Sequence, residues 1–534
     1  MPALSILIWL PAACGLLGAI AYRAMAGSGS ARAIPGALAL IGSVAALALS
    51  IGYIVEYEPG TQLLHVTGQT LQHVTNVTWI ASLGIHYKLG VDGLNVLLVG
   101  LTALLFAVAM LASNLRRESP PDRPHLYYLF FMVAESAVLG AFLAQDLILF
   151  VAFFDLMLIP FYFLVGIWGE GERSQRIKAT IKLVIYTLVG SLLMLAAAIA
   201  TGVLASQQHG TPITFVLSSL QGLQLSRGSQ EWIFLFFAAA FLVKMPAFPL
   251  HGWMPDGYKA MPIEVLMVFS GVLSKVGAYG FLAIVLPLFP QASVHFQMLM
   301  LLIALSSIIY GTAVAFTQTD ARLIAGFSSV AQLGFITLGI FSLQPQGAQG
   351  ALLQMVNHGL VVAPIFFIIL LLSRRAGGSE DIRSMGGVAF RAPVFATLFL
   401  IVALATLAMP GSANFVGEFL ILLGVFKSKL AIAVIGFAGV VGASVYALRL
   451  FIRAMHNRVG PEVRSHEISL RDGLVLVPLI GAILFLALYP QPALKRSERS
   501  TSTAVAAERL LTEPSVLHIA SAPSTVASTQ EGSR

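Results

Sequence analysis

Two lysines lie inside apolar runs of this chain: Lys244 in FLFFAAAFLVKMPAFP (residues 234–249) and Lys275 in VLMVFSGVLSKVGAYGFL (residues 265–282). Each run has the composition of a membrane-spanning helix. A charge at the centre of a bilayer costs about 3 kcal/mol on insertion scales unless it faces protein or water. The two runs therefore predict a membrane protein whose buried charges serve the movement of something charged.

Three carboxylates lie at comparable depth in other apolar runs. Glu135 occurs in LFFMVAESAVLGAFL, Asp155 in LILFVAFFDLMLIPFYFLVGIWG and Glu418 in NFVGEFLIL. A carboxylate near a lysine lowers the cost of burying the lysine's charge, and Asp155 is the predicted partner of Lys244. These five ionisable groups are the main evidence for function in the sequence.

Each buried group also has a purely structural interpretation. Lys244 could snorkel from a span end, Lys275 could form a structural ion pair, and Glu135 could be held by a serine or a backbone group. Glu418 could be a carboxylate at the positive end of a helix dipole. His358, in LQMVNHGLVVAPIF, titrates near neutral pH and is a candidate proton carrier, although a lone histidine in a span is often only hydrogen-bonded to a neighbour.

The composition excludes several classes of protein. Of 534 residues, 57% are hydrophobic and 10% are charged, against roughly 25% charged in soluble domains. The long apolar runs predict helices and not a barrel. The sole cysteine, Cys14, excludes an intrachain disulfide and cysteine-ligated clusters, and we predict no metal or cofactor in this chain. The net charge of +7 predicts basic loops on one side of a membrane and not nucleic-acid binding.

We predict an all-α polytopic membrane protein with about fourteen spans. The first is interpreted as a retained span and not a signal peptide. The spans lie at residues 3–22, 34–55, 90–112, 126–144, 147–168, 177–204, 230–249, 262–286, 295–318, 322–342, 349–373, 393–426, 430–455 and 473–490. The seventh contains Pro246 and Pro249 and the twelfth contains Pro410 and Gly411, so both are predicted to be broken where they line a wet cavity.

The basic residues predict the orientation. If the N-terminus is outside, the inner loops hold twenty of the 31 lysines and arginines and the outer loops hold four. Under the positive-inside rule both termini lie on the outer side. The outer segment around Trp79–Tyr87 alternates and predicts a hairpin. The Ser/Thr/Ala-rich tail from Gln491 predicts loosely ordered chain without a long amphipathic helix.

A short sequence similarity between two spans indicates an internal repeat. The tripeptide at Lys244–Pro246 matches Ala408–Pro410, five spans later, and an odd number of spans inverts the repeated element in the membrane. We therefore predict two inverted five-helix repeats. The predicted divisions are 1–125 (spans 1–3 and the hairpin), 126–290 (first repeat), 291–456 (second repeat) and 457–534 (span 14 and the tail).

Several of these motifs together resemble the antiporter-like subunits of respiratory complex I. The residues that carry the resemblance are GVDGLN (90–95), DLMLIPFYFLVGIWG (155–169), FPLHGWMPD (248–256), GVLSKVGAYGFL (271–282) and NFVGEFLIL (414–422). The resemblance covers essentially the whole chain. The glutamate at 418 resembles the M type of these subunits, which includes the fourth mitochondrial subunit and its photosynthetic relative, because the L and N types have lysine there and the L type adds a long lateral helix.

The resemblance implies a proton path. Its candidates are Glu135, Asp155, Lys244, Lys275, His358 and Glu418. The chain departs from the family pattern at four positions. Asp155 stands in place of glutamate, Tyr258 of histidine, Ala260 of glutamate and Gln332 of histidine, and the last departure requires water to bridge the path.

The implied function is proton translocation in the membrane arm of an NADH:quinone oxidoreductase. Such a chain binds no NADH, flavin or quinone itself. Its partners are L-type and N-type antiporter-like subunits, protons, ordered water and lipid, with no nucleic acid. The alternatives are a subunit of a multi-subunit sodium/proton antiporter, a subunit of a related hydrogenase or photosynthetic complex, and a membrane scaffold that pumps nothing.

Overall fold

The computed structural model describes residues 3–25, 31–59, 71–115 and 121–512. In this part of the chain nearly all regular structure is helical. The membrane-crossing elements are α1 (Leu4–Ala24), α2 (Ile34–Glu56), α3 (Val96–Leu115), α4 (Pro124–Leu143), α5 (Leu147–Leu156), α6 (Leu158–Trp168), α7 (Arg173–His209), α9 (Arg227–Lys244), α11 (Ile263–Val268), α12 (Ser274–Gly280), α15 (Gln297–Thr317), α16 (Ala321–Ile340), α17 (Pro345–Arg375), α18 (Pro393–Thr406), α19 (Ala413–Ser428), α20 (Leu430–Met455) and α21 (Leu470–Leu488). The shorter helices are α8 (Leu217–Leu220), α10 (Met254–Ala260), α13 (Leu286–Leu288), α14 (Pro290–His295), α22 (Gln491–Ala504) and α23 (Ala506–Thr512).

Each of the fourteen predicted spans contains helix. Twelve segments of the described chain are helical over a length and apolarity sufficient to cross a membrane. The two predicted spans that fall outside these twelve are the seventh, α9, and the twelfth, α18 with α19. These are the spans predicted to be broken, so the shortfall from fourteen has a structural cause.

The two breaks have local causes. α9 ends at Lys244, and Pro246 and Pro249 follow before α10 begins; proline lacks the N–H that continues a helix. The Trp253 indole donates to the Val243 carbonyl at 3.0 Å, which satisfies one carbonyl freed by the break. Between α18 and α19, Gly411 has φ +92°, a conformation that glycine adopts without strain.

Two further irregularities were not predicted. The fifth span is interrupted at Met157, between α5 and α6, because Pro160 cannot donate to the carbonyl one turn earlier. The eighth span contains two π-helical segments, Phe269–Leu273 and Phe281–Val285, on either side of α12. Such segments inside α-helices occur frequently at functional sites.

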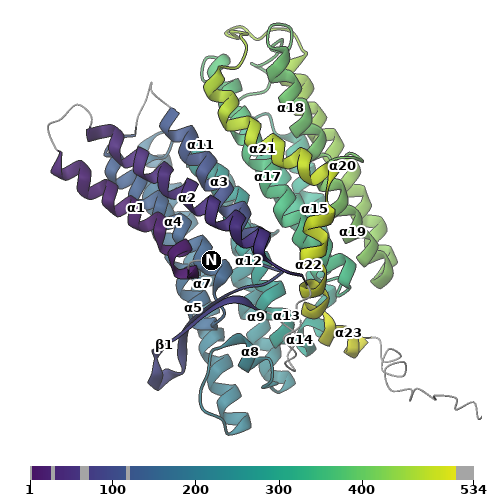
Figure 1. Cartoon of the computed structure of the whole chain (residues 1–534). Helices are drawn as coiled ribbons and strands as arrows, with labels where there is room; N and C mark the ends of the chain where they lie inside the picture. The colour runs from purple at the N-terminus through teal and green to yellow at the C-terminus, as the bar shows by residue number, and fades with distance from the viewer. Residues whose placement is uncertain (1–2, 26–30, 60–70, 116–120, 513–534) are drawn as a thin grey trace, which may run out of the picture.

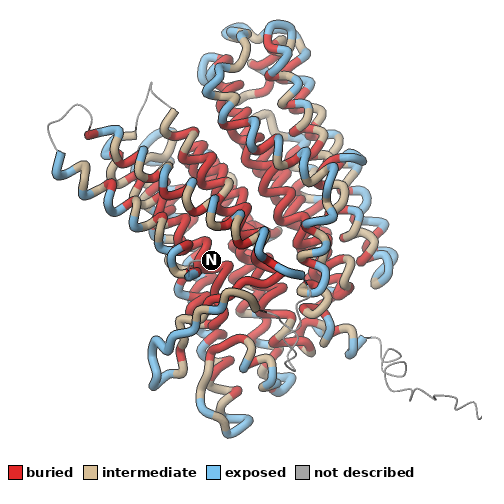
Figure 2. The backbone as a smooth tube through the Cα atoms, viewed as in Figure 1, coloured by how far each residue is buried: buried red, intermediate tan, exposed pale blue. Residues whose placement is uncertain are grey.

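Three segments form the buried centre of the bundle: the eighth span, α16 and α17, whose most apolar windows are entirely buried. Figure 2 shows this continuous buried interior and the exposed residues around it. The outer helices, such as α1, α2, α7 and α20, expose apolar side chains along their lengths. The buried helices carry Lys275, Gln332 and His358, so these polar groups lie at the centre of the fold and away from the lipid-facing helices.

The predicted hairpin is confirmed. β1 (Gln72–Ile80) pairs antiparallel with β2 (Ile85–Val91) through a turn at 81–84. The hairpin lies at the same end of the bundle as α8 and α23, opposite α11 (Figure 1). The division of the chain into two inverted repeats stays a prediction.

The prediction of a loosely ordered tail is wrong for residues 491–512, which form α22 and α23. The small residues that suggested disorder are spaced to form one buried face of α22, comprising Ala493, Ser497, Thr501 and Ala504. Gln349 of α17 donates to the Leu494 carbonyl at 2.9 Å, and the Gly93 amide donates to the Ser500 hydroxyl at 3.1 Å. Small side chains therefore allow close packing of this tail against the bundle.

Candidate functional site

Lys275 lies fully buried on α12. Its side chain turns back along the helix, and its Nζ donates to the Ser270 carbonyl at 2.5 Å and to the Ser274 hydroxyl at 3.2 Å. In the described chain no ion pair includes Lys275. The imidazole of His358, on α17, lies within electrostatic reach of this lysine. Lys275 is therefore held by neutral oxygens, and it can change charge without breaking a salt bridge.

Glu418 is buried at the start of α19. The Gln332 amide, on α16, donates to Glu418 Oε1 at 2.8 Å. Gln354 of α17 donates in turn to Gln332 Oε1 at 2.7 Å. Glu418 Oε2 has no hydrogen-bond partner among the described residues, and the buried Tyr446 of α20 is a neighbour. The carboxylate thus has one oxygen that is oriented by an amide and one buried oxygen without a hydrogen-bond partner among the described residues.

These two clusters share helix α17. Gln354 and His358 are four residues apart, so their side chains lie one above the other on one face. The resulting row runs from Lys275 through His358, Gln354 and Gln332 to Glu418. An amide orients water and carboxylates by hydrogen bonding but does not titrate. A proton can therefore use this row only with water between the titratable groups.

Lys244 is buried at the end of α9, immediately before the helix break. Its Nζ lies 4.8 Å from the centroid of the Phe154 ring, a cation–π contact. No ion pair among the described residues joins Lys244 to Asp155. Asp155 lies beside the Ser191 hydroxyl of α7, within electrostatic reach of Lys244, and it is partly exposed on the isolated chain. Lys244 and Asp155 are thus close enough to interact electrostatically, but they do not form a direct salt bridge.

Glu135 stands apart from the other candidates. It lies on α4, fully buried, and accepts a hydrogen bond of 2.5 Å from the Ser43 hydroxyl of α2. Cys14 of α1 is within electrostatic reach. The hydrogen bonds of Glu135 thus connect it to the N-terminal helices and not to the row on α17, and its place on a proton path stays a prediction.

The motif at 90–95 has a structural role at the entry to α3. Asp92 accepts hydrogen bonds from the amides of Leu94 and Asn95, both at 2.9 Å, and Asn95 donates to the carbonyls of Gly90 and Phe142. Burial raises the pKa of Asp92 to about 6, which the two backbone amides partly counteract. This motif caps the helix and fixes it to α4.

Sequence reasoning missed several residues of the site. Gln354 stands one turn before His358 in LQMVNHG, and its polarity in an apolar run was the available signal. Gln332 was noted only as a lost histidine, although it contacts Glu418 directly. Arg322 is buried and binds both Glu170 and Glu380 at 2.6 Å, but in the sequence it looks like an ordinary basic residue at a span end.

These features define a class of protein: a polytopic membrane protein with two broken spans and a buried row of titratable and amide side chains. A family model described as "NADH:quinone oxidoreductase/Mrp antiporter, TM" matches residues 144–444. The chain belongs to this family.

The relatives narrow the assignment. NADH-quinone oxidoreductase subunit M of Escherichia coli (strain K12) is 38% identical over 427 residues, covering 79% of this chain and 83% of that protein. Subunit M of Rickettsia typhi is 33% identical over 459 residues, covering 86% and 89%. The predicted resemblance to the antiporter-like subunits, and to their M type, is confirmed.

Solved structures agree with this assignment. A chain of respiratory complex I from Thermus thermophilus with bound NADH superposes with a TM-score of 0.82 and 29% identity, covering 95% of this chain and 99% of that one. A chain of the Mrp complex from Dietzia sp. DQ12-45-1b gives a TM-score of 0.77 at 18% identity over 95% and 100%. At that identity the likeness to the Mrp chain shows a shared fold.

Proposed function

We propose that this chain is the M-type proton-translocating subunit in the membrane arm of an NADH:quinone oxidoreductase. The single observation that carries the proposal is the buried row from Lys275 to Glu418, because a chain that only held its neighbours together would gain nothing from it. Buried ionisable groups in membrane segments are expensive and mark ion or proton pathways. The identity to subunit M relatives supports the parent complex.

The mechanism begins at Lys244 and Asp155. A charge change arriving from a neighbouring subunit alters the field between them, and Lys244 then releases its proton toward the centre of the chain. Lys275 takes up the proton as an ammonium held by the Ser270 carbonyl. When Lys275 releases it, the proton passes by way of His358 and ordered water to Glu418, the exit-side group.

The amide-lined part of the row limits this mechanism. Between His358 and Glu418 the polar side chains are Gln354 and Gln332, which cannot carry the proton themselves. Their hydrogen bonds hold Glu418 in one orientation and supply donors and acceptors for a bridging water. The step from His358 to Glu418 is therefore a transfer through water, oriented by two amides.

The proposal places electron transfer outside this chain. It assigns no NADH, flavin, quinone or metal to these residues. The L-type and N-type subunits are the proposed neighbours, and both termini are proposed to lie on the outer side of the membrane. A sodium/proton antiporter subunit is the second candidate, since the family model covers both kinds of complex. Neighbouring genes for flavin and iron–sulfur subunits would favour the first.

The test replaces Lys244. Lys244→Ala should remove most NADH-driven proton uptake by inverted vesicles while the complex assembles. Lys244→Arg should fail to restore it, because arginine stays protonated. Lys182→Ala is the matched control, since that lysine is exposed and bound to Asp256 at 2.7 Å. Normal uptake in the Lys244→Ala complex would refute the proposal.

A further inference from the structure

A cavity of about 710 Å³ opens at the end of the bundle opposite the hairpin, where α3 and α17 end and α21 begins. Apolar spans end where the hydrocarbon of a bilayer ends, so the cavity lies at the level of the lipid headgroups. Its volume falls in the range of about 300–1,000 Å³ that is usual for small-molecule sites. None of the residues from Lys275 to Glu418 that form the buried row lines this cavity.

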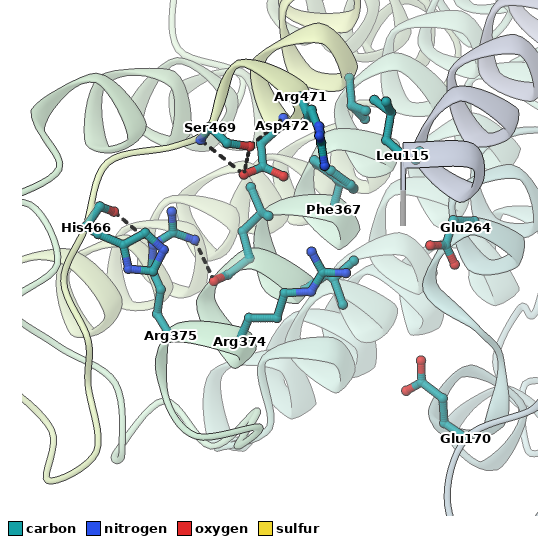
Figure 3. A pocket seen from close by; sticks show the side chains of 14 residues that line it. Leu115, Glu170, Glu264, Phe367, Arg374, Arg375, His466, Ser469, Arg471 and Asp472 are labelled. Carbon is teal, nitrogen blue, oxygen red and sulfur yellow. Dashed lines mark hydrogen bonds between the residues drawn. The ribbon is translucent and has the colours of Figure 1, made fainter. Parts of the chain in front are cut away.

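Two arginines supply unpaired positive charge to the cavity. Arg374 lies at the end of α17 and Arg471 at the start of α21, and both are exposed. Among the described residues, neither side chain forms an ion pair. The third arginine, Arg375, is buried and donates to three backbone carbonyls. Figure 3 shows the Arg374 and Arg471 side chains extending into the cavity near Phe367. Guanidinium groups without a counter-charge at headgroup level indicate an anionic ligand.

The acidic residues of the lining do not neutralise these arginines. The Ser469 hydroxyl donates to the Asp472 carboxylate at 2.8 Å, and Glu170 is bound to Arg322 at 2.6 Å. Both carboxylate oxygens of Glu264 are sealed from solvent. The positive charge of the two exposed arginines is therefore available to a ligand in the cavity.

Apolar side chains lie one turn deeper in the membrane than each exposed arginine. On α17, Leu371 precedes Arg374 by three residues and lies on the same face. On α21, Val475 follows Arg471 by four residues, again on the same face. Leu115, at the end of α3, adds to this apolar wall. A phospholipid has the same order along the membrane normal, with an anionic headgroup outside and acyl chains inside, whereas a free phosphate has no part that contacts the wall.

We propose that this cavity binds a phospholipid with an anionic headgroup, such as phosphatidylglycerol. Arg374 and Arg471 hold the phosphate, which guanidinium groups can bind with two parallel hydrogen bonds, and the acyl chains lie along Leu371 and Val475. The bound lipid joins α3, from the N-terminal part of the chain, to α17 and α21. This inference goes beyond proton translocation and does not depend on it.

Photo-crosslinking from the cavity wall identifies the occupant. The photoreactive amino acid p-benzoylphenylalanine replaces Leu115, which is half-buried and lines the cavity. The whole complex is reconstituted into phosphatidylethanolamine vesicles that contain a minor share of phosphatidylglycerol. The same amino acid at Leu484 of α21, which is 42% exposed, reports the surrounding lipid. Illumination should link position 115 to phosphatidylglycerol far above its share of the vesicle, and position 484 in proportion to that share.

The arginines are tested in the same assay. Arg374→Gln combined with Arg471→Gln should lower the enrichment at position 115, by roughly fivefold for each arginine removed. The matched control combines Arg173→Gln with Arg391→Gln, which removes the same charge from exposed arginines that do not line the cavity, and it should keep the enrichment.

Three results would overturn the proposal. They are no enrichment of phosphatidylglycerol at position 115, a cross-link from this position to a neighbouring subunit, which would assign the cavity to a protein contact, and enrichment that persists without Arg374 and Arg471. Cross-linking does not depend on NADH-driven proton uptake, so failure of the lipid site is distinguishable from failure of the proposed function.

Discussion

The burial of Arg322 gives the sharpest stability prediction. Its Nη2 lies 2.6 Å from both Glu170 and Glu380, and its Nη1 donates to three backbone carbonyls, those of residues 258, 259 and 261. The guanidinium thus joins α16 to the loop after α6, to the loop after α17 and to the junction between α10 and α11. Arg322→Gln would leave these carboxylates without their cation. Breaking a fully buried ion pair by removing one partner costs about 3–5 kcal/mol, and we expect the lower end of that range here because the side chains of Glu170 and Glu380 are 38% and 21% exposed.

The chain contains a matched control for this prediction. Arg383 pairs with Asp381 at the same N–O distance of 2.6 Å, but its side chain is 71% exposed, against 3% for Arg322. An exposed pair is worth about 0–1 kcal/mol, so Arg383→Gln should hardly change stability. Thermal unfolding of the two variants in one detergent would compare them. Equal midpoints would refute the argument that burial sets the value of the Arg322 pairs.

Three further predictions concern Glu418, Asp155 and the C-terminal tail. Glu418→Gln should impair proton uptake more than assembly, with Glu418→Asp partly active, and normal pumping by the glutamine variant would make Glu418 a structural group. Asp155→Asn should resemble loss of Lys244 in the same vesicle assay, whereas Asp155→Glu should be tolerated; equal activity of both would remove Asp155 from the mechanism. Burial raises the pKa of Glu508 from its ordinary 4.5 to about 8, so the docking of α23 is most stable below pH 4.5, where Glu508 is neutral, and it weakens as the pH rises through 8. Proteolysis of α23 should therefore increase over that range. Glu508→Gln, which cannot ionise, should abolish this pH dependence.

The sequence predicted the spans because apolar length and proline position are local properties. The predicted breaks follow from Pro246 and Pro410, and the hairpin from alternation before Tyr87. The tail could not be predicted in the same way. The Ser and Thr residues of α22 have low helix propensity, and only the surface of α17, which lies far away in the sequence, makes their small size favourable.

In the site, too, some residues could be predicted from the local sequence and others could not. The ionisable residues of the site could be recognised in the sequence because a charge in an apolar run is costly. Gln332 and Gln354 did not stand out, since a neutral amide in a membrane helix is less unusual and its meaning depends on which side chain it meets. Their hydrogen bonds join α16, α17 and α19, and no local pattern specifies that meeting. Only one link of the row, the four-residue spacing of Gln354 and His358 on one helix, is readable from the sequence, and the prediction did not use it.

The position of Asp155 bears on how a charge change in a neighbouring subunit could affect Lys244. A shared proton between Lys244 and Asp155 would require direct contact, and the described chain has none. Instead Lys244 contacts the Phe154 ring, and Asp155 lies beside Ser191 with part of its surface exposed. One oxygen of the Asp155 carboxylate is sealed from solvent and has no hydrogen-bond partner among the described residues. In the mechanism that we propose, the coupling between these groups would therefore act through their electrostatic interaction, and a neighbouring subunit could change that interaction without moving either side chain.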